Sequence, residues 1–213
     1  MTIIASDFKA QSWFSDVREI KLPNKWNNGS EDVDVTSIGE SVFHGCSQLT
    51  NITIPDSVTN IGDDVFYYCI QLTNITIPDS VTRIGNFAFY GCNQLTNITI
   101  PDSVTNIGDS AFYGCSGLTS VYITDLAKWC NILFSDVNSN PLFYAHNLYL
   151  NGDKITDLVI PDNVTSIGDY MFVYCSGLTS VVIPNSVTSI EDYAFYYCDN
   201  LTSVTIPNSV ARI

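Results

Sequence analysis

The seven cysteines are the residues of this chain with the widest range of chemistry. Regularly spaced thiols could bind a metal or form disulfides. However, there is no C-x-x-C pair, and only two histidines are available to complete a zinc site. We therefore expect six of the cysteines to be small buried side chains, as free cysteine often is. These six recur in two series with a spacing of 23 residues: Cys46, Cys69, Cys92 and Cys115, then Cys175 and Cys198.

Cys130 lies outside both series, beside Trp129. It is the one candidate for a reactive thiol, and His146 could in principle serve as its base. No third residue that would orient the imidazole is apparent, so we favour a buried structural role for Cys130. The chain also has no phosphate-binding loop, dinucleotide glycine pattern, nucleophile elbow or zinc helix. These features predict that the chain is not an enzyme, with no catalytic residue, cofactor or metal site.

Two sets of aspartates recur with the same period as the cysteines. The first set is Asp56, Asp79, Asp102 and Asp162, and the second is Asp63, Asp109, Asp169 and Asp192. Carboxylates are preferred ligands of calcium, so weak calcium binding by the first set remains an alternative, although the ligand spacing of a dedicated calcium loop is missing. For the second set we expect that each aspartate caps a short helical turn.

Composition and charge exclude several classes of protein. Of the 213 residues, 46% are hydrophobic and 14% are charged, which is enough apolar material for a buried core. The net charge of −14 repels phosphate backbones and anionic lipid, so we expect no nucleic-acid partner. No apolar stretch has the length of a membrane-spanning helix, so we expect no membrane insertion. The N-terminus shows no basic region followed by an apolar region, so no signal peptide is visible.

A repeat of 23 residues determines where all of these side chains lie. Its pattern is L-x-x-I/V-x-I-P-x-x-V-x-x-I-G-x-x-A-F-x-x-C-x-x. The alternating β-branched start predicts a short strand that ends at the proline. The glycine marks a turn, and the A-F segment is long enough only for one tight helical or 3-10 turn. Stacked units of this kind predict an α/β repeat solenoid with a parallel β-sheet on one face and short helical turns on the other.

The repeat divides the chain into a short N-terminal segment and a single solenoid. Residues 1–16, with Phe8, Trp13 and Phe14, are expected to cover the first unit. The solenoid spans 17–213, with units 17–48, 49–71, 72–94, 95–117, an enlarged unit 118–154, 155–177, 178–200 and a partial unit 201–213. Because equivalent positions of stacked units lie about 4.8 Å apart, we expect a buried column of Phe43, Phe66, Phe89, Phe112, Phe172 and Phe195.

Two exposed stripes are candidate binding surfaces. The Thr/Asn stripe follows the outward side of the expected concave sheet and comprises Thr50, Asn51, Thr53, Thr73, Asn74, Thr76, Thr96, Asn97 and Thr99. It could bind a ligand by hydrogen bonds and shape, or could simply be a soluble β surface. The aromatic stripe on the turn side comprises Tyr67, Tyr90, Tyr113 and Tyr196. Such residues favour interfaces, although some of them could instead seal the gaps between units.

The enlarged unit and the C-terminus depart from the repeat. Residues 125–134 have the apolar spacing of a helix with Asp125 as its N-cap. Asn151-Gly152 predicts a hairpin with strands near 148–150 and 155–160. Residue Ile213 stands at an apolar position with no polar capping unit after it. Since solenoids usually carry polar caps, we expect either a longer array or self-association through this end.

The I-P…V-x-x-I-G…A-F-x-x-C framework at 23-residue spacing resembles the BspA-like leucine-rich-repeat family. The match is close over 49–117 and 155–213 and looser over 17–48. The resemblance implies a non-catalytic protein-binding module, of the type found in bacterial surface adhesins that contact host matrix proteins such as fibronectin or fibrinogen. It also implies a cell-surface or secreted location. An intracellular interaction scaffold and a carbohydrate-binding surface are the alternatives.

Overall fold

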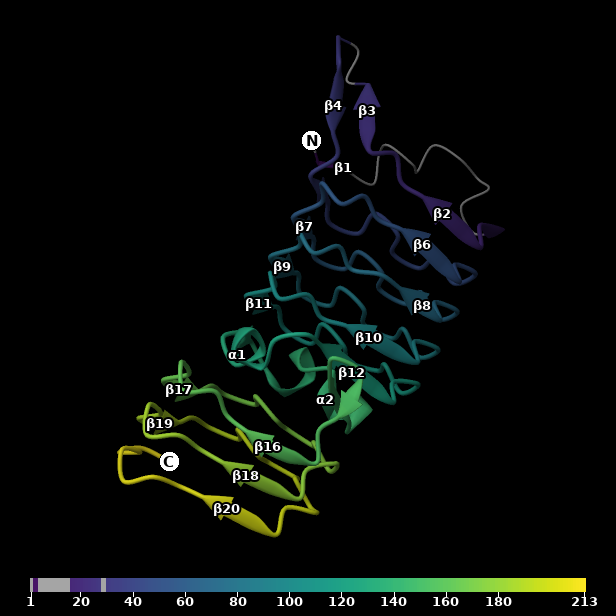
Figure 1. The fold of residues 1–213 in the computed structure, drawn as a ribbon. Helices are drawn as coiled ribbons and strands as arrows, with labels where there is room; N and C mark the ends of the chain where they lie inside the picture. Colours follow the sequence, from purple (N-terminus) through teal and green to yellow (C-terminus); the bar gives the residue numbers. More distant parts are fainter. Residues whose placement is uncertain (1, 4–15, 28–29) are drawn as a thin grey trace.

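Short parallel strands, one above another, build the whole molecule. The computed structural model describes residues 2–3, 16–27 and 30–213, and Figure 1 shows their units as successive layers from the N-terminal to the C-terminal end. The first strand of each unit, together with β14 of the enlarged unit, lies on one face of the stack, here called the first sheet, which has three hydrogen-bonded parts. These strands are β2 (Glu19–Lys21), β6 (Asn51–Thr53), β8 (Asn74–Ile75), β10 (Asn97–Thr99), β12 (Ser120–Ile123), β14 (Leu148–Leu150), β16 (Asp157–Val159), β18 (Ser180–Val182) and β20 (Ser203–Thr205).

A second parallel sheet forms from the V-x-x-I segment, where we had expected no strand. Its strands are β1 (Thr2–Ile3), β5 (Ser37–Ile38), β7 (Asn60–Ile61), β9 (Arg83–Ile84), β11 (Asn106–Ile107) and β13 (Leu133–Phe134), followed by the separate pair β17 (Ser166–Ile167) and β19 (Ser189–Ile190). The pairing follows the repeat, since Asn60 lies opposite Arg83 and Asn51 lies opposite Asn74. Both sheets therefore stack equivalent residues of neighbouring units.

The A-F segments form a third hydrogen-bonded ladder instead of helices. Asp64 and Tyr68 have positive φ angles of 55° and 54°, which few residues other than glycine adopt. In this conformation Asp64 N donates to Asn86 O at 2.8 Å, and Tyr68 N donates to Tyr90 O at 2.7 Å. The α/β description is therefore correct only in part. The parallel-stranded solenoid is confirmed, but the described helices are few and short, and the regular units contain consecutive turns.

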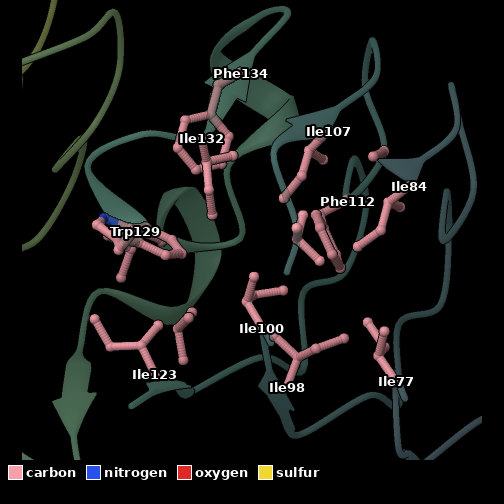
Figure 2. Packing of buried hydrophobic residues seen from close by; sticks show 14 of the residues in the cluster. Ile77, Ile84, Ile98, Ile100, Ile107, Phe112, Ile123, Trp129, Ile132 and Phe134 are labelled. Carbon is pink, nitrogen blue, oxygen red and sulfur yellow. The ribbon is translucent and has the colours of Figure 1, made fainter. Parts of the chain in front are cut away.

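The core lies between the two sheets and the turns, as stacked columns of like side chains. Phe66 and Phe89 have ring centroids 5.3 Å apart, and so do Phe89 and Phe112, with nearly parallel planes. Figure 2 shows Phe112 between isoleucines of the two sheets, among them Ile98 and Ile107. The expected phenylalanine column is thus confirmed in two runs, Phe43 to Phe112 and Phe172 to Phe195, which lie on either side of the enlarged unit. Phe195, near the C-terminal end, is only partly buried.

All seven cysteines are free and buried, as expected. Four of the thiols donate a hydrogen bond to the carbonyl of the phenylalanine in the preceding unit, for example Cys92 Sγ to Phe66 O at 3.2 Å. Burial raises the pKa of Cys92 and, to about 12, that of Cys175. Cys92 and Cys175 therefore lie in the core as protonated thiols at neutral pH.

The regular spacing of one glycine series has a packing reason. A Cβ atom added to Gly85 would lie 2.5 Å from the carbonyl carbon of Gly62 in the preceding unit, and one added to Gly108 would lie 2.6 Å from Asn86 N. Side-chain carbon atoms do not approach backbone atoms this closely. Glycine is required here because neighbouring units touch backbone to backbone.

The enlarged unit forms a joint at which strand pairing stops. β13 ends the six-stranded part of the second sheet, and the hairpin of β14 with β15 (Asp153–Lys154) ends the part of the first sheet that starts at β10. The Asn151-Gly152 hairpin is confirmed, but its second strand is β15, and residues 157–159 belong to the next unit as β16. The expected 125–134 helix is too long. Only α1 (Leu126–Trp129) is helical, capped by the Asp125 side chain as predicted, whereas 133–134 pair as β13 with β11.

Side chains hold this joint together. Trp129 Nε1 donates to Met171 O at 3.2 Å, and the buried Asn140 side chain donates to Tyr170 O at 2.9 Å and Met171 O at 3.2 Å. Asn140 Oδ1 also accepts from Leu142 N, at the start of α2 (Leu142–Ala145), which follows the 3-10 turn of Val137–Ser139. In Figure 2 Trp129 and Phe134 close the core at this point.

At the N-terminal end, β1 extends the second sheet by pairing with β5. The expected covering residues Phe8, Trp13 and Phe14 lie outside the described residues. The additional residues of the first unit include an antiparallel hairpin of β3 (Lys25–Asn27) and β4 (Asp32–Asp34), which projects from the stack in Figure 1. In the part of the chain that the structure describes, no helix is long and apolar enough to cross a lipid bilayer.

Candidate functional site

The Thr/Asn stripe lies on the first sheet and points away from the core. Asn51, Thr53, Thr73, Asn74, Thr76, Thr96, Asn97 and Thr99 are exposed, and Thr50 is half-buried. Part of its hydrogen-bonding capacity is used within the solenoid. Thr73 Oγ1 donates to Thr50 O at 3.3 Å, and Thr50 Oγ1 donates to Arg18 O at 2.9 Å. The threonine column that contains Thr50 and Thr73 therefore forms hydrogen bonds between neighbouring units.

The structure brings together three residues of the aromatic stripe as a stack on the turn face. Tyr67 and Tyr90 have ring centroids 4.7 Å apart, and Tyr90 and Tyr113 have centroids 4.9 Å apart. His44 extends the stack, 4.6 Å from Tyr67. Tyr196 is not part of it, because it lies beyond the joint and contacts Tyr174, Tyr193 and Tyr197.

The sequence analysis missed His44, although its position carried the signal. It stands 23 residues before Tyr67, in the same column, where the following units have tyrosine. An imidazole is flat enough to stack on a phenol ring, and the two planes here differ by 10°. The stack therefore begins one unit earlier than predicted.

Additional aromatic side chains flank the stack at right angles. Tyr68 and Phe87 contact Tyr90 in edge-to-face geometry, at centroid distances of 5.5 and 6.1 Å. Tyr68 is 48% exposed and Phe87 is 37% exposed, which is unusual for large side chains in a folded protein. The Tyr68 ring lies over Gly91, where an added Cβ would meet the ring at 2.7 Å.

Two shallow hollows lie along this turn face, one on each side of the joint. The first has a volume of about 650 Å³ and is lined by Ser41, His44, Asp64, Tyr67, Phe87 and Tyr90. The second is smaller, about 220 Å³, and is lined by Val137, Tyr170, Tyr193 and Tyr196. Both are open to solvent, so they suit a partner's side chain better than an enclosed small molecule.

Two neighbouring carboxylates beside the first hollow differ in their surroundings. Asp63 accepts hydrogen bonds from Asn86 N at 2.9 Å and from the Arg83 guanidinium at 3.1 Å. Asp64 lines the hollow, and desolvation raises its carboxyl pKa, while His44 acts in the opposite direction. The charge of Asp63 is thus paired within the solenoid, whereas Asp64 faces the hollow.

We had predicted that each aspartate of the second set caps a turn of its own unit, and this is wrong. Asp63 Oδ1 accepts from Asn86 N and Asp169 Oδ1 accepts from Asp192 N, and both donors belong to the following unit. The carboxylates therefore connect successive turns. Among the described residues, no group of three or more histidine, cysteine or acidic side chains is arranged to hold a metal ion.

Cys130 and His146 have different partners in the structure. Cys130 is the buried C-cap of α1, and burial, reinforced by the charge of Asp125, raises its thiol pKa to about 12. The His146 Nδ1 atom lies 3.1 Å from Tyr174 O, on the far side of the joint. A protonated buried thiol is a poor nucleophile. The favoured structural role of Cys130 is therefore confirmed.

The two parallel sheets, the stacked core and the repeat register define a leucine-rich-repeat solenoid. Comparison with protein families then identifies its kind. The model of the BspA type leucine rich repeat region matches residues 16–140 and 145–213, with 6 copies. The chain belongs to this family, whose repeats form protein-interaction modules and are typically non-catalytic.

Solved structures with the same fold come from several bacteria. A leucine-rich repeat protein from Bacteroides ovatus is 28% identical, with a TM-score of 0.63 over 91% of this chain and 46% of that one. The T. pallidum leucine rich repeat protein is 26% identical, with a TM-score of 0.51 over 91% of this chain and 72% of that one. A leucine-rich repeat protein from Eubacterium ventriosum is also 26% identical, with a TM-score of 0.52 over 94% and 57% of the two chains. No curated protein matches the chain.

Proposed function

We propose that this chain is a non-catalytic protein-binding module that contacts its partner through the turn face, with the aromatic stripe at its centre. The observation that carries the proposal is the exposure of aromatic rings along this face. Tyr113 is 43% exposed, and Tyr193 and Tyr196 are 56% and 44% exposed. Tyrosine is enriched at protein interfaces, because its ring excludes water while its hydroxyl forms hydrogen bonds.

The Thr/Asn stripe is the weaker candidate for contact with a partner. Hydroxyl groups of its first column already donate to backbone carbonyls, and Asn97 Nδ2 donates to Thr96 Oγ1 at 3.1 Å. The exposed atoms that remain are small and offer little area to bury. Because a few large buried side chains supply most of the energy of an interface, this stripe fits a supporting role.

The geometry of the rings favours a protein over a carbohydrate partner. Sugars bind aromatic residues by packing on ring faces, but the faces of Tyr67 and Tyr90 are covered by their neighbours in the stack. The stack presents ring edges and hydroxyl groups to solvent. We extend the proposal to a surface-exposed adhesin role toward host matrix proteins, which family membership supports, with an intracellular scaffold as the alternative.

The test compares exposed tyrosines of the turn face with the Thr/Asn stripe in binding to defined matrix proteins. Surface plasmon resonance would measure binding of fibronectin, fibrinogen and a panel of other purified proteins to the wild-type chain. For a panel protein that binds the wild-type chain, we expect the double variant Tyr68→Ser, Tyr113→Ser to lower the affinity about tenfold or more. The double variant Thr76→Ala, Thr99→Ala should leave the affinity unchanged. Circular dichroism of each variant would verify folding.

The opposite ranking of these variants would assign binding to the Thr/Asn stripe and refute the proposal. Binding of a panel protein other than fibronectin and fibrinogen, with the same dependence on the tyrosines, would retain the module and reject the matrix role. Fractionation of the native cell would separate the surface location from the intracellular one.

A further inference from the structure

The first hollow combines an aromatic wall with a carboxylate in a way that the second does not. Phe87 and Tyr90 meet at a ring-centroid distance of 6.1 Å on one side of it, and Asp64 lines it as well. The second hollow, of Val137, Tyr170, Tyr193 and Tyr196, includes no carboxylate in its lining. The two hollows of the turn face therefore suit side chains of different chemistry.

Asp64 and its neighbour Asp63 differ in their ion pairing. Asp63 forms an ion pair with Arg83 at 3.1 Å. Over the residues that the structure describes, no ion pair is formed by the Asp64 carboxylate. The surroundings are acidic, since Asp63 and Glu40 both act on Asp64 with like charge, and only His44 acts with opposite sign. A cation placed here would be attracted by all three carboxylates.

The combination of surfaces defines the shape of the group that fits. A lysine or arginine side chain has an apolar stem that can cover aromatic carbon and a charged head that seeks a carboxylate. Phe87, which is 37% exposed, offers ring surface for the stem and for a cation–π contact. The net charge of −14 would also draw a basic partner toward the chain.

We propose that the hollow between Asp64 and Phe87 is a docking pocket for a lysine or arginine side chain of the protein partner. The proposal rests on the proposed function, which places the partner on the turn face. It goes beyond that function by naming the chemistry of the anchor. A positively charged segment of the partner would lie across the stack of His44, Tyr67 and Tyr90, with one basic residue in the pocket.

The experiment selects peptides from a random display library on the immobilised wild-type chain. The best peptide is then synthesised with arginine, or with its neutral isostere citrulline, at each basic position. We expect the selected sequences to be rich in lysine or arginine. One citrulline replacement is expected to weaken binding about three- to tenfold, the range of a partly exposed charged contact.

Variants of the chain locate the contact. Asp64→Asn should reduce affinity by the same factor as citrulline and should remove the difference between the arginine and citrulline peptides. Asp79→Asn, which removes the same charge from an exposed turn outside the hollow, should retain that difference. Phe87→Ser should weaken both peptides, and circular dichroism would show that it folds.

Three results would overturn the pocket: selection that yields no binding peptide, selected sequences without basic residues, or an arginine preference that survives Asp64→Asn. The proposed function fails separately, when the tyrosine variants Tyr68→Ser, Tyr113→Ser leave protein binding unchanged. A chain that needs those tyrosines but not Asp64 would keep the binding face and lose the basic anchor.

Discussion

The phenylalanine column allows a quantitative test of the stacked core. Phe89 is fully buried and contacts a ring on each side, Phe66 and Phe112, both at 5.3 Å. Truncation of a buried phenylalanine to alanine costs about 3–5 kcal/mol, and each aromatic pair adds about 0.5–1.5 kcal/mol. Because the cost of truncation already includes part of the pair energy, we expect Phe89→Ala to lower the free energy of unfolding by about 4–6 kcal/mol.

Phe195 is the matched control. It carries the same side chain in the same column, but it is only partly buried and has one stacked neighbour, Phe172, at 5.3 Å. We expect Phe195→Ala to cost about 2–3 kcal/mol, since less area and one ring pair are lost. The difference between the two variants, about 2 kcal/mol, is the measure of central stacking.

Urea unfolding followed by circular dichroism and by tyrosine fluorescence would measure both variants. Two probes are needed because repeat proteins can unfold in parts. If Phe89→Ala costs no more than Phe195→Ala, the column does not act as a continuous stack, and the reasoning that derives every stripe from the 23-residue register is wrong.

Three further predictions concern packing, the joint and the thiols. Gly85→Ala should lower the free energy of unfolding by about 1–3 kcal/mol or more, because the added Cβ would lie 2.5 Å from the Gly62 backbone. Gly168→Ala, whose Cβ would have only Met171 Cε within reach at 3.4 Å, should be nearly neutral, and thermal melts would compare the two variants. Asn140→Ala should cost about 2–4 kcal/mol, because it removes the hydrogen bonds to Tyr170 O and Met171 O and leaves Leu142 N without its acceptor. Exposed Asn97→Ala should change the free energy of unfolding in urea by less than about 0.5 kcal/mol. Burial raises the thiol pKa of Cys198 to about 11 and that of Cys175 to about 12, from 9.0. The free energy of unfolding should therefore be constant below about pH 9 and should decrease as the pH rises toward these values. Urea titrations at pH 8 to 10.5 check this, and an equally steep decrease in the Cys175→Ala variant would contradict it.

The residue spacing was sufficient to predict the columns but not the ladders that hold them. Phe66, Phe89 and Phe112 could be aligned from the sequence, because any stack of equal units puts equivalent residues side by side. The second sheet could not be seen in one unit, since its strands are two residues long and gain their hydrogen bonds only from neighbours. The turn ladder was hidden for the same reason, and the A-F segment was therefore interpreted as helical.

The site was predictable to the extent that it follows the register. Tyr67, Tyr90 and Tyr113 form the stack that their spacing indicated. Phe87 and Asp64 stand in a different column, whose place beside the stack depends on the positive φ angles of the turn. Trp129 and Asn140 donate hydrogen bonds to Met171 O, which is 42 and 31 positions away, respectively. These separations do not match the 23-residue repeat, so no periodic pattern identifies such contacts.

Every backbone ladder of the regular part joins residues at the same position of adjacent units, and this makes the unit interchangeable. Removal of 72–94 would place Leu95 directly after Gln71 and bring Phe66 against Phe112, with Gly62 facing Gly108. Strands, turns and thiols would find equivalent partners, so the array can shorten or lengthen by whole units without a new fold. The same change would move Asp64 beside Ser110 in place of Phe87 and erase the mixed pocket. Length can therefore vary freely in such a chain, whereas recognition depends on which two units happen to be neighbours.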